Sequence, residues 1–203
     1  MTRKTILIFG VSSFVGSNLA EGLKKKYRVI GTYYNNKVEI EDVLTLKCDV
    51  HNQEFVRKLV MLFKPDFTIY AVGLSGLQEC HDNQKLSDHL NTSAVFNVSK
   101  ATELYRSRFI YISSGFVFSG DKEILKVSET PRPITVYGNS LASSEFYIQK
   151  SCLNYLILRI GAVFGRGINP KKMSFFEKME FSSLKKEKYC SNLNRWLGAE
   201  LVG

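Results

Sequence analysis

Short apolar runs that alternate with longer amphipathic stretches most limit what this chain can fold into. We expect strands at 5–9, 29–33, 44–47, 67–72, 109–113 and 155–160, and helices at 14–26, 52–63, 91–105 and 137–150. Strands joined through helices form βαβ units with right-handed crossovers, which build a parallel sheet covered on both faces. The sequence therefore predicts an α/β fold of the Rossmann type, with a doubly wound parallel sheet.

A glycine turn directly follows the first expected strand. It reads Gly10-Val11-Ser12-Ser13-Phe14-Val15-Gly16, which matches the spacing GxxGxxG with Ser13 in place of the middle glycine. Gly10 allows a tight turn, Gly16 allows close packing of helix on strand, and the helix N-terminus offers N–H groups to a pyrophosphate. The Ser13 side chain narrows the approach, although its hydroxyl could also donate to phosphate. We interpret the turn as a dinucleotide site; the alternative is a plain structural turn.

The end of the second expected strand bears on which dinucleotide would bind. An NAD-selective site usually has an acid there for the ribose 2′-hydroxyl, but no acid occurs before Glu39. Asn35, Asn36 and Lys37 could instead accommodate a 2′-phosphate, so the sequence favours NADP over NAD. The alternative is an ordinary polar loop.

The net charge of +9 has a local component, because lysines gather after about Asn169. Such a surface suits phosphorylated ligands, and a solvated face is the alternative. No nucleic-acid-binding module is recognised, and no run of eighteen apolar residues predicts a membrane span. The scattered cysteines and the histidines lack metal spacing, so we expect no metal, reduced thiols and a cytoplasmic protein.

Six strings of residues occur in an order and spacing that resemble the extended short-chain dehydrogenases/reductases. The chain is most similar to the dTDP-4-dehydrorhamnose reductases and related epimerase-like sugar-nucleotide proteins. The resemblance covers roughly residues 5–166, and the strings are IFGVSSFVGSNLA, VIGTYYN, NTSAVFNVSKA, YISSGFVFSG, VYGNSLASSE and LRIGAVFG.

The resemblance implies a role for each matching position. Tyr137 would be the catalytic proton donor, and Ser114 would hydrogen-bond the substrate carbonyl. The positions implied to bind the cofactor, NADP or NAD, are Gly10, Ser12, Ser13, Phe14, Val15, Gly16, Tyr33, Asn35, Asp49, Val50, Ala71, Val72, Gly73, Asn91 and Tyr137. The substrate would be a nucleotide sugar, and family analogy implies a homodimer.

Two departures from the family pattern bear on activity. The family has a lysine four residues after the tyrosine, where this chain has Leu141. The family also has a longer C-terminal part that forms most of the sugar-nucleotide pocket. We therefore expect an NAD(P)-binding domain at residues 1–168 and a short, Lys-rich remnant of the substrate region at 169–203, in a chain that is either a fragment or a natural short form.

The missing lysine separates two functional hypotheses. The family lysine lowers the pKa of the tyrosine, whereas at an ordinary pKa of about 10 only about one phenol in a thousand is ionised at pH 7. A reductase needs a phenol that donates a proton, and an un-ionised phenol can still do so, so the reduction rate would fall without reaching zero. A reaction that first oxidises its sugar needs the phenolate as a base, so its rate would fall further. The first hypothesis is an attenuated NAD(P)-dependent reductase of a nucleotide-linked keto sugar. The second is a non-catalytic NAD(P)-binding regulatory or scaffold protein.

Overall fold

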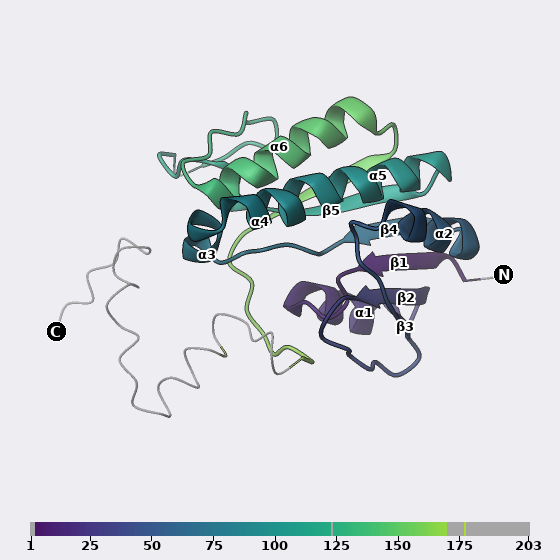
Figure 1. Ribbon diagram of the computed structural model, residues 1–203. Helices are drawn as coiled ribbons and strands as arrows, with labels where there is room; N and C mark the ends of the chain where they lie inside the picture. Colours follow the sequence, from purple (N-terminus) through teal and green to yellow (C-terminus); the bar gives the residue numbers. More distant parts are fainter. Residues whose placement is uncertain (1–2, 123, 170–176, 178–203) are drawn as a thin grey trace.

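Six parallel strands form one sheet in the computed structural model, which describes residues 3–122, 124–169 and 177 (Figure 1). The strands lie in the order β3-β2-β1-β4-β5-β6. Their bounds are β1 (Thr5–Phe9), β2 (Arg28–Tyr33), β3 (Leu44–Lys47), β4 (Phe67–Tyr70), β5 (Arg108–Ser114) and β6 (Tyr155–Ile160). This is the order of a doubly wound sheet, and the predicted fold class is confirmed.

Helices cover the two faces of the sheet unequally. They are α1 (Phe14–Leu23), α2 (Gln53–Phe63), α3 (Leu77–Asp82), α4 (Gln84–Asp88), α5 (Ala94–Leu104) and α6 (Val136–Ser151), with a π-helical turn η1 (His89–Ser93) and a 3-10 turn η2 (Gly115–Val117). In Figure 1, α2, α5 and α6 lie along one face, and α1 lies on the other beneath β1 and β2. This placement follows from right-handed crossovers, because the chain moves across the sheet in opposite directions before and after β3.

Two apolar clusters fill the space on either side of the sheet. One joins Tyr70, Phe109 and Tyr111 to the buried faces of α2, α5 and α6. The other joins the opposite side of β1 and β2 to Ala20 of α1 and to the β2–β3 loop. Near β6 this second side is thinly covered among the described residues, since Leu156 and Leu158 are both more than a third exposed.

The structure differs from the sequence prediction mainly between β4 and α5. Residues 77–93 form α3, α4 and η1, none of which was predicted as a separate element. These segments are too short to show a helical period over a full window of residues. The predicted helix 91–105 accordingly begins as α5 only at Ala94, and the predicted helix 14–26 ends at Leu23, where the chain turns into β2.

The expected C-terminal region lies largely outside the described residues. Of residues 170–203 only Glu177 is described, so the predicted boundary at residue 168 and the Lys-rich stretch stay predictions. In the described part of the chain, no helix has both the length and the apolarity that a bilayer span requires.

Candidate functional site

The carboxyl ends of β1 and β4 form the point at which the strand order reverses. The two strands are neighbours, yet the chain continues from β1 to β2 on one side and from β4 to β5 on the other. In open α/β sheets, ligands bind in the crevice outside such a switch point. The glycine turn follows β1 here, and residues 71–73 follow β4, so the topology brings these two predicted cofactor segments together.

The glycine turn is held in a conformation that a side chain could not adopt. Gly10 has a φ of 88°, and a Cβ on it would lie 2.7 Å from the carbonyl oxygen of Ala71. A Cβ on Gly16 would lie 2.2 Å from the carbonyl oxygen of Gly10. The turn is also tied to β2, because the N–H groups of Gly10 and Val11 both donate to the carbonyl oxygen of Thr32. Both glycines are therefore required for the chain to pass this closely over the end of β1.

Ser13 caps α1, and its hydroxyl both accepts and donates a hydrogen bond. Its Oγ accepts a hydrogen bond from the N–H of Gly16 at 3.0 Å and donates one to the carbonyl of Gly10 at 2.8 Å. The Ser13 hydroxyl, which we considered as a donor to a phosphate, thus donates its proton within the turn. The N–H groups of Phe14 and Val15, in the first helical turn, have no acceptor within the helix and remain available to an anion.

The chain after β6 returns to the glycine turn, which the sequence did not predict. The side-chain amide of Asn169 donates to the carbonyl of Ser12 at 3.2 Å, and that of Asn18 donates to the carbonyl of Arg166 at 3.2 Å. These bonds join residues about 150 positions apart. Asn18 and Asn169 were missed because a single amide in a loop carries no sequence signal for its distant partner.

The predicted adenine end of the site lies at the ends of β2 and β3. Tyr33 is half-buried, Asn35 is exposed and Val50 is buried. Asp49 holds its neighbour His51, since its Oδ1 accepts from the backbone N–H of His51 at 2.9 Å and lies 3.1 Å from the ring Nδ1. The carboxylate that would meet the adenine is therefore positioned by local hydrogen bonds.

The two histidines near this end pack face to face. The rings of His51 and His89 stack with centroids 3.4 Å apart and planes within 2° of parallel. The Nε2 of His51 also lies 3.0 Å from the carbonyl oxygen of His89. The stacked pair links the β3–α2 loop to η1. No group of three or more side chains that could hold a metal ion occurs among the described residues.

Asn91 lies beneath the loop after β4 and is buried. Its Oδ1 accepts from the N–H of Leu74 at 2.8 Å, and its Nδ2 donates to the carbonyl of Leu74 and to the hydroxyls of Ser87 and Ser140. The amide thus ties this loop to α4 and α6. Ala71 and Val72 are half-buried and Gly73 is exposed; a Cβ on Gly73 would press against Oδ1 of Asn91. Contact of these residues with a cofactor stays a prediction.

Ser114 and Tyr137 come together from different elements, and their predicted roles in a reaction stay predictions. Ser114 is the last residue of β5, and Tyr137 lies in the first turn of α6, which Thr135 caps through a 2.9 Å hydrogen bond from Gly138. Burial raises the pKa of Tyr137, and the hydroxyl of Ser114 interacts with the phenol and lowers it by a smaller amount. The phenol therefore stays protonated beyond its ordinary range, which favours a proton donor over a base.

Leu141 follows Tyr137 by one helical turn and is buried in the apolar core, with 4% of its surface exposed. A leucine offers neither a charge to stabilise a phenolate nor a hydrogen bond to a ribose. The position that follows Tyr137 by one helical turn therefore holds an apolar side chain in the core.

A buried ion pair supports the elements that carry Ser114 and Tyr137. Glu145 of α6 is 1% exposed and accepts three hydrogen bonds from Arg159 of β6, the shortest from Nη2 at 2.7 Å. Its Oε1 also accepts from the hydroxyl of Ser113 at 2.5 Å. Arg159 continues to the carbonyls of Val127 and Glu129, in the loop before α6. The sequence analysis missed this network, because only the fold brings β6 beside α6.

The described residues fit a dinucleotide at this edge. Gly10 and Gly16 let the turn pack closely over the end of β1, where neither position has room for a Cβ, and the first turn of α1 presents its N–H groups at this edge. Ser114 and Tyr137 lie at the same edge of the sheet, after β5.

Comparisons with known proteins agree with this arrangement. The model of the family described as RmlD substrate binding domain matches residues 4–189. The dTDP-4-dehydrorhamnose reductase of Salmonella typhimurium is 25% identical over 196 residues, which are 96% of this chain and 61% of that protein. Methionine adenosyltransferase 2 subunit beta of Danio rerio is 24% identical over 163 residues, which are 80% of this chain and 49% of that protein. The chain thus spans about half to three fifths of the length of these relatives.

Solved structures show the same fold at low sequence identity. The dTDP-4-dehydrorhamnose reductase from Bacillus anthracis, in complex with NADP, superposes with a TM-score of 0.74 at 22% identity, covering 91% of this chain and 61% of that one. The Bordetella bronchiseptica enzyme WbmH, in complex with NAD+, gives 0.78 at 17% identity, covering 92% and 64%. With the family match spanning most of its length, this chain belongs to the RmlD substrate-binding domain family.

Proposed function

We propose that this chain binds NADP(H) at the carboxyl edge of its sheet and reduces a nucleotide-linked keto sugar slowly. The observation that carries the proposal is the pairing of Ser114 with a half-buried, protonated Tyr137 at the edge that holds the glycine turn. The names of the relatives support it, since they include dTDP-4-dehydrorhamnose reductases, and a structural neighbour was crystallised with NADP.

The chemistry requires one hydride and one proton. NADPH, when bound, would supply the hydride that the carbonyl carbon accepts and would leave as NADP+. As the carbonyl π bond breaks, the phenol of Tyr137 transfers its proton to the carbonyl oxygen, and Ser114 holds that oxygen by donating a hydrogen bond. The products are the sugar alcohol and a phenolate, which regains its proton from water.

Leu141 makes the reduction of a keto sugar slow, and it makes reactions that first oxidise their sugar slower still. None of the described residues places a cation beside Tyr137, so the phenolate left after proton transfer is poorly stabilised, and burial raises its energy further. An epimerase or dehydratase must begin with that phenolate as a base. We therefore infer that reduction survives better than any activity that first oxidises its sugar.

The preference for NADP rests on the loop after β2. Lys37 forms an exposed ion pair with Glu39, with Nζ and Oε1 2.6 Å apart. Exposed ion pairs contribute little free energy, so Lys37 can exchange Glu39 for a ribose 2′-phosphate. Asn35 lies in the same exposed loop and offers a further donor.

A second candidate function is a non-catalytic, cofactor-binding subunit. Leu141 is the observation that favours it, because the core position that would carry the lysine is filled by an apolar side chain. One relative is named as a subunit of methionine adenosyltransferase. In that case the cofactor would act as a structural ligand that stabilises the fold.

The first experiment is a calorimetric titration with NADPH and, separately, NADH. We expect micromolar binding with a preference for NADPH; no binding of either would contradict both candidate functions. Reduction of dTDP-4-dehydrorhamnose is then followed as loss of NADPH absorbance.

The variant Leu141→Lys separates the two candidates, with Leu141→Met as a control of similar volume. We expect the lysine to raise the reduction rate and the methionine to leave it unchanged. Cofactor binding without turnover in all three proteins would favour the subunit.

Two further proposals concern the cellular compartment and the oligomeric state of the protein. Cys48, Cys80 and Cys152 are buried free thiols, which supports a reducing compartment such as the cytoplasm. The homodimer expected from the resemblance stays a prediction, which the molecular mass in solution would test.

A further inference from the structure

A hollow lies at the edge of the sheet opposite the cofactor site. It measures about 620 Å³ and is lined by Arg3, Thr5, Lys24, Tyr27, Arg28, Asp42 and Asp66. These residues come from the amino ends of β1, β2 and β4 and from the turns beside them. Because the strands are parallel, this edge is separated from the glycine turn by the full length of β1.

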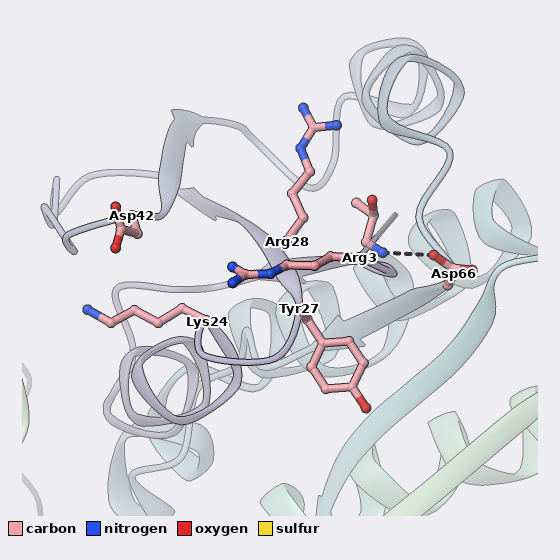
Figure 2. A pocket seen from close by; sticks show the side chains of 7 residues that line it. Arg3, Lys24, Tyr27, Arg28, Asp42 and Asp66 are labelled. Atoms are coloured by element: carbon pink, nitrogen blue, oxygen red, sulfur yellow. Dashed lines mark hydrogen bonds between the residues drawn. The ribbon is translucent and has the colours of Figure 1, made fainter. Parts of the chain in front are cut away.

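Two guanidinium groups in the hollow have no counterion among the described residues. In the described part of the chain, neither Arg3 nor Arg28 makes a side-chain hydrogen bond or an ion pair, and both residues are exposed. Figure 2 shows the charged ends of Arg3, Lys24 and Asp42 on one side of the hollow, while the side chain of Arg28 extends in a different direction. Like charges that share a hollow favour the binding of an anion between them.

The other charged groups that line the hollow differ in how far they are engaged. Lys24 pairs with Glu21 at 2.8 Å and donates to the carbonyl of Glu41. One oxygen of Asp66 accepts from the N–H of Thr5 at 2.7 Å, which holds that carboxylate against β1 (Figure 2). Asp42 makes no such bond and lies at the rim, held in a left-handed conformation with a φ of 61°. The unengaged groups are thus two guanidiniums and one carboxylate.

We propose that this hollow is a second ligand site, which takes a phosphate monoester that carries hydroxyl groups, as a sugar phosphate does. The planar forks of Arg3 and Arg28 suit bidentate hydrogen bonds to phosphate oxygens. The carboxylate of Asp42 accepts from a ligand hydroxyl. The site stands independently of the proposed reductase activity.

The test is calorimetry with glucose 6-phosphate on protein saturated with NADPH, so that the cofactor site is already filled. We expect binding that weakens as salt is raised, because exposed charges are screened. Arg3→Gln and Arg28→Gln should each weaken it about tenfold or more, since each removes charge-assisted hydrogen bonds. Arg57→Gln is the matched control, because Arg57 is an exposed arginine of α2 outside the hollow.

Asp42→Asn tests the hydroxyl contact. We expect it to weaken glucose 6-phosphate binding and to leave inorganic phosphate binding unchanged or stronger. The proposal is overturned if no heat appears at about 10 mM ligand, well above a millimolar Kd. It is equally overturned if both arginine variants bind as well as Arg57→Gln, or if glucose 6-phosphate displaces NADPH. A separate NADPH titration of the same variants reports on the cofactor site alone.

Discussion

Removing the charge of Glu145 tests the ion pair that supports the reacting residues. In Glu145→Gln, the guanidinium of Arg159, whose side chain is 19% exposed, loses its only carboxylate partner among the described residues. Breaking a buried pair on one side costs about 3–5 kcal/mol. The lower end applies here, because Arg159 keeps the carbonyls of Val127 and Glu129. We expect the free energy of unfolding to fall by about 3 kcal/mol.

Urea denaturation followed by circular dichroism measures this change. The matched control is Glu54→Gln, which breaks the exposed ion pair with Lys58 and should cost less than about 1 kcal/mol. Replacing both Glu145 and Arg159 by methionine removes both charges and should recover most of the stability lost in the single variant. A Glu145→Gln protein that unfolds at the same urea concentration as the Glu54→Gln protein would refute the reasoning.

Three further predictions concern the glycine turn, the proton donor and a buried thiol. Gly16→Ala should abolish NADPH binding and destabilise the fold, because its Cβ would lie 2.2 Å from the Gly10 oxygen. Gly22→Ala, where a Cβ meets no atom within 4 Å, should do neither. Equal NADPH affinities of the two variants, measured by calorimetric titration, would contradict this. Tyr137→Phe should lower keto-sugar reduction about 10²–10⁴-fold with unchanged NADPH binding, and the wild-type rate should not decline up to pH 9, because burial raises the pKa of the phenol. Burial raises the pKa of Cys48 to about 12. The contribution of the neutral thiol to the free energy of unfolding is therefore complete below the pKa of the unfolded thiol and is lost as the pH rises toward 12. Fast alkylation of Cys48 in the folded protein at pH 8 would disprove this.

The sequence by itself determined the layer architecture and the edge of the sheet where a cofactor would bind. Apolar strands such as Thr5–Phe9, followed by amphipathic helices, leave a parallel sheet as the way to bury both faces, and a glycine turn after the first strand is a local signal. The roles of Ser114 and Tyr137 and the replacement of the family lysine by Leu141 came from the resemblance to the family, and these roles stay predictions.

Only the tertiary structure decided which distant groups satisfy one another. It placed Asn91 in a buried network, and it brought Arg159 to Glu145 and Asn169 to Ser12. It also showed that the Ser13 hydroxyl bonds within its own turn. In the part of the chain that the structure describes, it also left the side chains of Arg3 and Arg28 without hydrogen bonds or ion pairs at one hollow. Hydrogen bonds and ion pairs form wherever the packed elements bring polar groups together, and apolar periodicity specifies which faces are buried without specifying which polar side chains meet across them.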